Sequence, residues 1–298
     1  MHELVFSTRT TLPSRTPDVL DRNKALLDTA EGYVYKSADG NDLGAYVFRP
    51  EGSPPPSGWP SALFFFSSTW DTGLLSQFAP HALYLASRGM VGVLIDYRVA
   101  SRHPGASPLD AMQDARSAIR WAREHAAELK FDPSRIVGIG GSAGAHAILS
   151  AAMLRRFLEA DGENTAVPCA PNALILFSPV TDTSRNSGAG FDRFPDKSAA
   201  RHADLIAAVR SRLPPMLIFH GTADRVVPFA NSRKFRRRNW WHRNLCRLRP
   251  FEGKGHGFFN FNVSVRVYEL TLSEIDAFLV ELGFLPTNPD DNGVPRLG

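Results

Sequence analysis

The fold of this chain is decided by residues 135–146, which read RIVGIGGSAGAH. An apolar run suited to a buried strand enters a G-x-S-x-G pentapeptide around Ser142, and an alanine-rich run suited to a helix leaves it. In a strand-turn-helix element of this kind the serine lies on a strained turn, and small neighbours let the strand and the helix approach each other. The stretch therefore predicts a reactive serine hydroxyl at the end of a central strand.

A serine hydroxyl is a poor nucleophile near neutral pH, so it needs a histidine base and a carboxylate that orients the histidine. Residues 216–219 form an apolar run, and the turn that follows contains Asp224. Residues 247–251 form an alternating run, and the glycine-rich loop that follows contains His256. We therefore predict a catalytic triad of Ser142, Asp224 and His256, in the order serine, acid, histidine.

Each of these residues also has an ordinary structural interpretation. Ser142 could cap a helix, Asp224 could belong to a simple turn, and His256 could be an ordinary histidine of a surface loop. Asp182, which follows another apolar run, is an alternative orienting acid. His220 is expected to make a structural hydrogen bond near the Asp224 turn, and His146 is expected to pack inside the molecule. Three motifs in one order are nevertheless far more specific than a lone G-x-S-x-G.

The rest of the chain alternates between short apolar runs and helical patterns, which predicts an α/β fold with a mostly parallel sheet and helices on both faces. Reactive groups then lie at the carboxyl ends of the strands. The predicted strands are 33–36, 43–48, 62–66, 91–95, 135–139, 173–177, 216–219 and 247–251, and the predicted helices are 78–88, 109–128, 143–158, a helix behind the Asp224 loop, and 269–282.

The length of 298 residues and the 43% hydrophobic composition allow one large core. We expect a single domain over residues 31–285, an N-terminal extension over 1–30 and a C-terminal tail over 286–298. Residues 181–213 are longer than a crossover between strands requires, so they are a candidate lid or pocket wall.

These motifs, together with residues 64–70 and Asp96-Tyr97-Arg98, resemble the α/β-hydrolase superfamily, in particular the hormone-sensitive-lipase-like group of acetyl esterases and carboxylesterases. The resemblance extends from about Tyr33 to Leu285. It implies an α/β-hydrolase fold with a central sheet of about eight strands. It also implies a serine carboxylesterase that hydrolyses short-acyl esters, including acetyl esters of carbohydrates, without a cofactor or a metal.

In that family the loop after the third strand reads H-G-G-G-W, and its backbone N–H groups help to form the oxyanion hole. Here the loop reads FSSTW over residues 66–70. The resemblance implies an oxyanion hole of Ser68, Thr69 and Ala143, and a hydroxyl of the loop could add a further donor. Serine or threonine at positive φ would cost on the order of 1 kcal/mol each, whereas a loop with ordinary backbone angles avoids that strain.

Aromatic residues near the predicted site are candidates for the walls of a substrate pocket. Trp70 follows the oxyanion loop, and Phe258 follows His256. Phe191 and Phe194 lie in the candidate lid. Packing in the core is the alternative role for each of these side chains.

The formal net charge is +4, and much of the basic excess lies in residues 233–243. Basic residues interleaved with aromatic ones could bind a nucleic acid, an anionic membrane or an anionic polysaccharide. We interpret this run instead as a solvated helix face whose aromatic residues turn to the core, and we expect no nucleic-acid partner because no nucleic-acid motif accompanies it. The two cysteines have no metal-ligand spacing and form no disulfide framework. Residues 1–22 lack the apolar core of a signal peptide, and no long apolar run exists, so we expect a cytoplasmic protein without a membrane span.

Two other functions remain open at this point. A serine peptidase of the same fold would use the same triad. A noncatalytic binding protein on a hydrolase scaffold is also conceivable, because fold does not fix function and the oxyanion loop departs from the family pattern. The complete set of three triad residues favours an enzyme.

Overall fold

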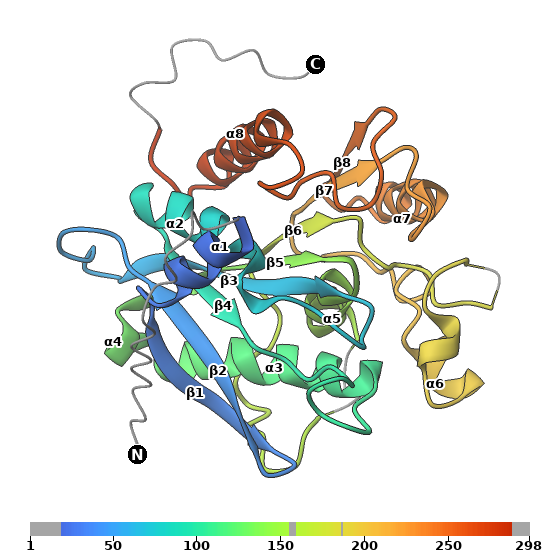
Figure 1. The fold of residues 1–298 in the computed structure, drawn as a ribbon, viewed down its shortest axis with the longest axis horizontal. Helices are drawn as coiled ribbons and strands as arrows, with labels where there is room; N and C mark the ends of the chain where they lie inside the picture. Colours follow the sequence, from blue (N-terminus) through green and yellow to red (C-terminus); the bar gives the residue numbers. More distant parts are fainter. Residues whose placement is uncertain (1–18, 155–158, 186, 288–298) are drawn as a thin grey trace.

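A computed structural model describes residues 19–154, 159–185 and 187–287 (Figure 1). Eight strands form one sheet in the order β1-β2-β4-β3-β5-β6-β7-β8. β1 pairs antiparallel with β2, and β2 pairs antiparallel with β4, whereas all the other pairs are parallel. The predicted α/β-hydrolase arrangement, a mostly parallel sheet of about eight strands flanked by helices, is confirmed.

The strands are β1 (Glu31–Ala38), β2 (Asn41–Phe48), β3 (Trp59–Ser68), β4 (Val91–Ile95), β5 (Phe131–Gly141), β6 (Ala173–Phe177), β7 (Met216–Gly221) and β8 (Cys246–Phe251). The α-helices are α1 (Val19–Leu27), α2 (Ala79–Ser87), α3 (Pro108–Glu124), α4 (Ala126–Leu129), α5 (Ser142–Met153), α6 (Lys197–His202), α7 (Phe229–Trp241) and α8 (Val265–Glu281). The short 3₁₀ helices are η1 (Leu75–Phe78) and η2 (Phe191–Arg193).

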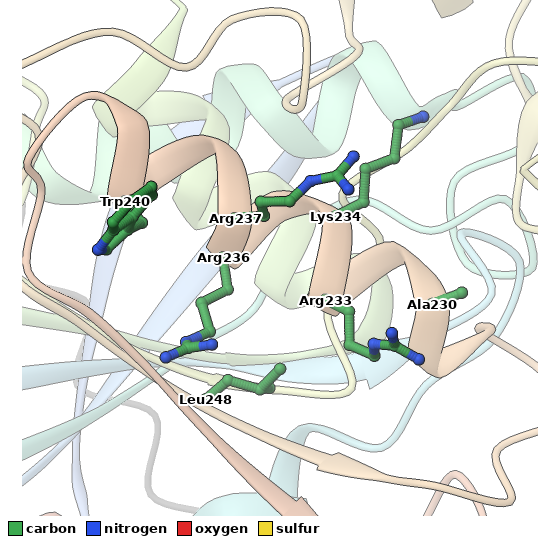
Figure 2. A pocket seen from close by; sticks show the side chains of 7 residues that line it. All are labelled: Ala230, Arg233, Lys234, Arg236, Arg237, Trp240 and Leu248. Carbon is green, nitrogen blue, oxygen red and sulfur yellow. The ribbon is translucent and has the colours of Figure 1, made fainter.

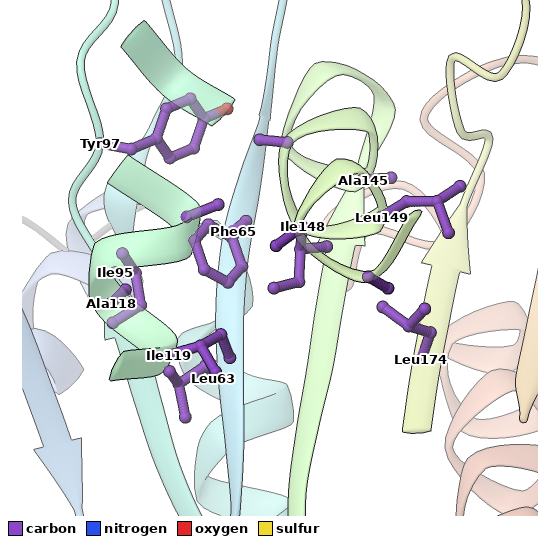
Figure 3. Packing of buried hydrophobic residues seen from close by; sticks show 14 of the residues in the cluster. Leu63, Phe65, Ile95, Tyr97, Ala118, Ile119, Ala145, Ile148, Leu149 and Leu174 are labelled. Atoms are coloured by element: carbon purple, nitrogen blue, oxygen red, sulfur yellow. The ribbon is translucent and has the colours of Figure 1, made fainter. Parts of the chain in front are cut away.

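The central strands are apolar because helices cover both faces of the sheet. One buried cluster contains Leu63 and Phe65 of β3 together with residues of α3, α5 and α7. A second cluster contains Phe64 of β3 together with residues of α2 and α8. Figure 3 shows part of the first cluster, with Leu63 and Phe65 lying between α3 and α5. Successive side chains of β3 therefore enter opposite cores, which accounts for its uninterrupted apolar run.

The structure refines several predicted boundaries. The helix predicted over residues 109–128 is divided at His125 into α3 and α4. α3 begins where Ser107 and Asp110 form a capping box, with Pro108 in the first turn. The helix predicted over residues 143–158 ends at Met153, and residues 155–158 lie outside the described part of the chain.

The N-terminal extension predicted over residues 1–30 includes α1, whereas residues 1–18 lie outside the described part of the chain. Leu26, Leu27 and Ala30 are partly buried against the second cluster. The packed core therefore reaches back beyond residue 31. In the described ranges, no helix is both long and apolar enough to cross a bilayer.

Hydrogen bonds hold residues 181–213 together internally and join the segment to α5. The Ile206 N–H donates to the Thr181 carbonyl at 3.0 Å, and the Thr183 hydroxyl donates to the Ala200 carbonyl at 2.6 Å. The Arg210 guanidinium donates to the Met153 carbonyl at the end of α5, at 2.7 Å. These contacts hold the segment beside α5, and its role as a lid or pocket wall stays a prediction.

His81 of α2 provides a test of the second core. Its ring lies among Phe78, Phe177 and Tyr268, and neither ring nitrogen has a hydrogen-bond partner within the described residues. Burial lowers the pKa of His81 to about 3. The unfolded chain protonates this histidine near pH 6.5, whereas the folded protein does so only near pH 3. The free energy of unfolding therefore falls as the pH falls from 6.5 toward 3.

We expect His81→Phe to stabilise the protein by about 1 kcal/mol at pH 7, because it removes two unpaired buried nitrogens. It should also remove about 2 kcal/mol of the stability loss between pH 7 and pH 5. Urea unfolding at both pH values measures this, with the exposed His202→Phe as the control. If the free energy of unfolding fell between pH 7 and pH 5 as much in His81→Phe as in the wild type, the low pKa of His81 would be contradicted.

Candidate active site

Ser142 lies where β5 passes directly into α5, and its backbone has the left-handed φ of 51°. A non-glycine residue in this region is strained by about 1–3 kcal/mol. A Cβ atom at Gly140 would lie 2.7 Å from the Ala145 nitrogen, and one at Gly144 would lie 2.3 Å from the Phe66 carbonyl oxygen. Both glycines are therefore required where the helix packs against the strands. This is the tight strand-to-helix turn that the G-x-S-x-G stretch predicts.

Asp224 and His256, which are 32 residues apart, meet beyond the carboxyl ends of β7 and β8. The Asp224 Oδ1 atom accepts the N–H groups of Val226 and Val227, each at 2.9 Å. The Oδ2 atom lies 2.8 Å from His256 Nδ1. Burial alone would raise the pKa of Asp224, but hydrogen bonds from His220, from His256 and from the backbone outweigh burial and hold that pKa well below its ordinary value. The carboxylate therefore stays ionised beside the imidazole.

The nucleophile elbow and the histidine loop adjoin the same segment, residues 178–180. The Val180 N–H donates to the Ser142 carbonyl at 3.4 Å, and the Ser178 hydroxyl donates to the His256 carbonyl at 3.4 Å. A Cβ atom at Gly141 would lie 3.3 Å from the Phe259 ring, three residues beyond His256. These contacts bring the two loops to one edge of the sheet.

The hydrogen bond between the Ser142 hydroxyl and the His256 imidazole is not formed within the described part of the chain, and His256 Nε2 has no other hydrogen-bond partner there. The His256 side chain is 21% exposed, so its imidazole ring is accessible to solvent. In enzymes without substrate, catalytic hydrogen bonds are often long and tighten only when substrate binds. The structure thus pairs Asp224 with His256, and the pairing of His256 with Ser142 stays a prediction.

The predicted oxyanion loop avoids the strain that its lack of glycines suggested. Positive φ occurs at Trp70, at 61°, and not at Ser67, Ser68 or Thr69. An isolated parallel bridge joins Ser68 to Ser142, so the loop begins beside the predicted nucleophile. The Thr69 N–H, however, donates to the Thr72 carbonyl at 3.4 Å, within the loop itself. That hydrogen bond does not favour Thr69 as a free oxyanion donor.

The conformation of this loop depends on Tyr97, which follows β4. Its hydroxyl donates to the Phe66 carbonyl at 2.7 Å and therefore accepts from the Ser68 hydroxyl at 2.8 Å. The Ser68 oxygen in turn accepts the Trp70 N–H at 3.1 Å. The Ser68 side chain is thus already bonded on both sides, and it does not supply the additional hydroxyl donor suggested by the sequence. Burial raises the pKa of Tyr97, so the hydroxyl stays protonated.

A second network joins the oxyanion loop to the histidine loop. The Ser67 N–H donates to Gln77 Oε1 at 2.6 Å, and Gln77 Nε2 donates to Asn260 Oδ1 at 2.8 Å. Asn260 Nδ2 then donates to the Gly257 carbonyl at 3.1 Å, next to His256. Nothing in the sequence signals the contact between Gln77 and Asn260, which are 183 positions apart.

The two predicted pocket residues lie in different surroundings. Trp70 packs edge-on against His146 and against Phe194 of the 181–213 segment, with ring centres 5.8 and 5.9 Å apart. Phe258 is buried in the second core cluster, with its ring centre 4.7 Å from that of Phe251. This packing does not support a pocket role for Phe258. His146 packs inside the molecule, as expected, and its Nδ1 atom lies 2.9 Å from the Val180 carbonyl oxygen.

Comparison with known proteins agrees with this geometry. A family model described as BD-FAE matches residues 60–238, which include Ser142 and Asp224. Thermogutta terrifontis esterase 2 phosphoramylated by tabun aligns with 42% sequence identity and a TM-score of 0.83, covering 88% of this chain and 98% of that protein. The butyrate-bound form of the same esterase aligns with 41% identity and a TM-score of 0.81, covering 88% and 97%.

A curated relative from Arabidopsis thaliana is described as a probable isoprenylcysteine alpha-carbonyl methylesterase. It is 25% identical over an alignment of 245 residues that covers 75% of this chain and 50% of the relative, so the chain spans about half of that relative's length. The BD-FAE model, by contrast, matches more than half of this chain, and the esterase structure covers nearly all of its described residues. The chain therefore belongs to the BD-FAE family of the α/β-hydrolase superfamily, as the nucleophile elbow, the strand order and these matches show.

Proposed function

We propose that this chain is a serine carboxylesterase that hydrolyses short-acyl esters through Ser142, His256 and Asp224. The observation that carries the proposal is the contact between His256 Nδ1 and the buried, ionised Asp224 at the edge of the sheet where Ser142 lies on its strained turn. A histidine that is held through Nδ1 keeps Nε2 for proton transfer. That arrangement favours a nucleophilic serine enzyme over a binding protein.

In the proposed reaction, the Ser142 Oγ attacks the ester carbonyl while His256 Nε2 takes its proton. The Asp224 carboxylate stabilises the imidazolium that forms. The Ala143 N–H, in the first turn of α5, is one of the backbone donors that the helix leaves unpaired, and it is available to the developing oxyanion. The imidazolium then gives its proton to the alcohol oxygen, and the alcohol leaves an acyl group on Ser142. Water hydrolyses this acyl-enzyme, with His256 again acting as the base.

Two observations support short acyl chains. The similar esterase from T. terrifontis is known with butyrate bound. In this chain, the rings of Trp70 and Phe194 pack edge to face next to the loop that borders Ser142, and we infer that they limit the length of the acyl chain. We also include acetyl esters of carbohydrates among the proposed substrates, and only the resemblance to acetyl esterases supports this extension.

The proposal is tested with p-nitrophenyl esters from acetyl to dodecanoyl. We expect kcat/KM to be highest for acyl chains of about two to four carbons and to fall at least about 10-fold for dodecanoate, if Trp70 and Phe194 limit the acyl chain as we infer. A peptide p-nitroanilide tests the peptidase alternative. Preference for the anilide, or an absence of turnover on every ester, would refute the esterase proposal.

Tyr97→Phe tests whether the oxyanion loop depends on the Tyr97 hydroxyl. The change leaves the Phe66 carbonyl and the Ser68 hydroxyl without their partner, so the loop is expected to shift. We expect a loss of about 1–3 kcal/mol in the free energy of unfolding and a fall of about 10-fold in kcat/KM. Urea unfolding and assays with p-nitrophenyl acetate measure the two effects.

Tyr35→Phe is the matched control, because it removes another buried tyrosine hydroxyl, which donates to the Asp96 carbonyl at 2.8 Å. It should lower stability while leaving kcat/KM within about twofold, because this hydroxyl holds the peptide group between Asp96 and Tyr97 and makes no hydrogen bond to residues 66–70 within the described part of the chain. Equal kinetic losses in the two variants would assign Tyr97 to stability alone.

A further inference from the structure

One side of α7 carries a strongly basic surface. The helix turns Asn231, Ser232, Phe235 and Asn239 inward. The side chains of the other face are exposed, and this face includes five basic residues: Arg233, Lys234, Arg236, Arg237 and Arg238. We call these five residues, with Trp240, Trp241 and Leu245, the α7 face.

The two tryptophans of the α7 face overturn the expectation that the aromatic residues of this run pack into the core. Phe235 is buried as expected, but Trp240 is 66% exposed and Trp241 is 72% exposed. The reason is helical spacing, because Phe235 and Asn239 continue the inward stripe and positions 240 and 241 lie beyond it at the end of the helix. Two large apolar rings are therefore left in solvent.

The charges of the α7 face are largely uncompensated. The Lys234 ammonium group lies 2.9 Å from Asp182 Oδ2. Within the described part of the chain, Arg233, Arg236, Arg237 and Arg238 form no ion pair. Some arginines elsewhere on the surface are paired, as in Arg49 with Glu31 and Arg247 with Glu281. Four neighbouring unpaired guanidinium groups repel one another, and an anionic surface would relieve that repulsion.

A groove runs along the α7 face, between the helix and the edge strand β8. Its volume is about 650 Å³, and the residues that line it are Ala230, Arg233, Lys234, Arg236, Arg237, Trp240 and Leu248. Figure 2 shows Arg236 extending from α7 toward Leu248 of β8, with Trp240 at the far end of the row of cations. The groove thus combines several cationic groups with an apolar end.

We propose that the α7 face binds the surface of an anionic lipid bilayer. Guanidinium groups match lipid phosphates, and tryptophan prefers the depth of the lipid headgroups. The rings of Trp240 and Trp241 lie edge to face with centres 5.0 Å apart, and Leu245, between α7 and β8, is 39% exposed. This apolar tip beside cations is the pattern of an interfacial segment. A nucleic acid would satisfy the arginines but would leave Leu245 without an apolar partner.

The test is co-sedimentation of the whole protein with vesicles of phosphatidylcholine that contain 30% phosphatidylglycerol, compared with pure phosphatidylcholine. We expect binding to the anionic vesicles that weakens with salt, because screening acts on the charged contacts. The triple variant Arg233→Gln, Arg236→Gln, Arg237→Gln should bind about 100-fold more weakly, at about fivefold per cation. The double variant Trp240→Ala, Trp241→Ala should bind at least about 10-fold more weakly even at low salt.

Two matched controls isolate the α7 face. Arg22→Gln, Lys24→Gln and Arg266→Gln together remove the same charge from exposed positions on α1 and α8. Val263→Ala with Val265→Ala trims exposed apolar residues elsewhere. Both controls should bind like the wild type, and all the variants should keep the wild-type turnover of p-nitrophenyl acetate, which separates this proposal from the esterase proposal.

Three outcomes would overturn the lipid assignment. The first is equal binding to neutral and anionic vesicles, and the second is equal weakening by the charge controls and the α7 variants. The third is the absence of vesicle binding together with salt-sensitive binding of a single-stranded DNA oligonucleotide that the triple arginine variant abolishes. That third result would assign the α7 face to nucleic acid instead.

Discussion

Ser142→Ala is expected to lower kcat/KM for p-nitrophenyl acetate by on the order of 10⁴-fold or more, to the level that substrate binding and backbone donors supply without a nucleophile. Because Ser142 has a φ of 51°, alanine at this position keeps the backbone strain and removes only the hydroxyl. Stability should therefore change little. Steady-state kinetics and urea unfolding of the same preparations measure both quantities.

A matched control lies two turns further along α5. Ser150 is also buried, and its hydroxyl donates to the Ala147 carbonyl at 2.7 Å within the helix, away from the elbow. Ser150→Ala should keep wild-type kcat/KM. A large loss in Ser150→Ala, or retained turnover in Ser142→Ala, would contradict the assignment of the nucleophile.

Covalent labelling provides an independent readout of the same prediction. T. terrifontis esterase 2 is known in a form phosphoramylated by tabun, so an organophosphate such as paraoxon is expected to react with this chain as well. We expect intact-protein mass spectrometry to show one diethylphosphoryl group on the wild type and none on Ser142→Ala. Labelling of the variant at the wild-type rate would place the reactive group elsewhere.

The parts of the fold that sequence predicts well are those set by local chemistry. The elbow follows from its small residues, because the contacts at Gly140 and Gly144 exclude larger side chains. The eight strands follow from short apolar runs, because strands covered on both faces need apolar residues on both sides. The contact of Asp224 with His256 follows from their positions after neighbouring parallel strands, β7 and β8.

What the sequence could not predict depends on contacts between distant residues. The oxyanion loop lacks glycine, and its positive φ falls on Trp70 while Tyr97 and Gln77 hold the Phe66 carbonyl and the Ser67 N–H from outside. No periodicity in the sequence places either side chain there. The exposure of Trp240 was missed for a related reason, since the inward stripe of α7 becomes visible only when the helix is packed on the sheet.

His220 shows how the Asp224 carboxylate is held in place. This histidine is fully buried on β7, and its Nε2 atom lies 2.9 Å from the Val227 carbonyl oxygen and 3.2 Å from Asp224 Oδ2. Since Nε2 faces two acceptors, it carries a proton, and Nδ1 then accepts from the Ser232 hydroxyl at 2.8 Å. The expected structural hydrogen bond of His220 therefore falls on the same carboxylate oxygen that contacts His256.

Asp224→Asn is expected to lower kcat by on the order of 10⁴-fold while leaving KM nearly unchanged. An amide has an NH₂ group, which cannot accept, in place of one carboxylate oxygen, so that group must face either the N–H groups of Val226 and Val227 or the two histidines. If its NH₂ group faces His256 Nδ1, that nitrogen must accept, and Nε2 then carries the proton and cannot act as the base. If its oxygen faces His256, the negative charge that stabilises the imidazolium is still missing. Assays with p-nitrophenyl acetate from pH 6 to 10 measure the effect.

Asp182→Asn decides between the two acids that the sequence allowed. Asp182 Oδ2 lies 2.9 Å from the Lys234 ammonium group, and its Oδ1 accepts the Ser184 N–H at 3.0 Å, so its carboxylate is bonded within its own surroundings and not to His256. We expect this variant to keep kcat within about threefold, because a carboxylate that does not touch the imidazole cannot fix its tautomer. If Asp182→Asn instead lost activity to the extent expected of Asp224→Asn, the contact between Asp224 and His256 would not be the one that serves catalysis.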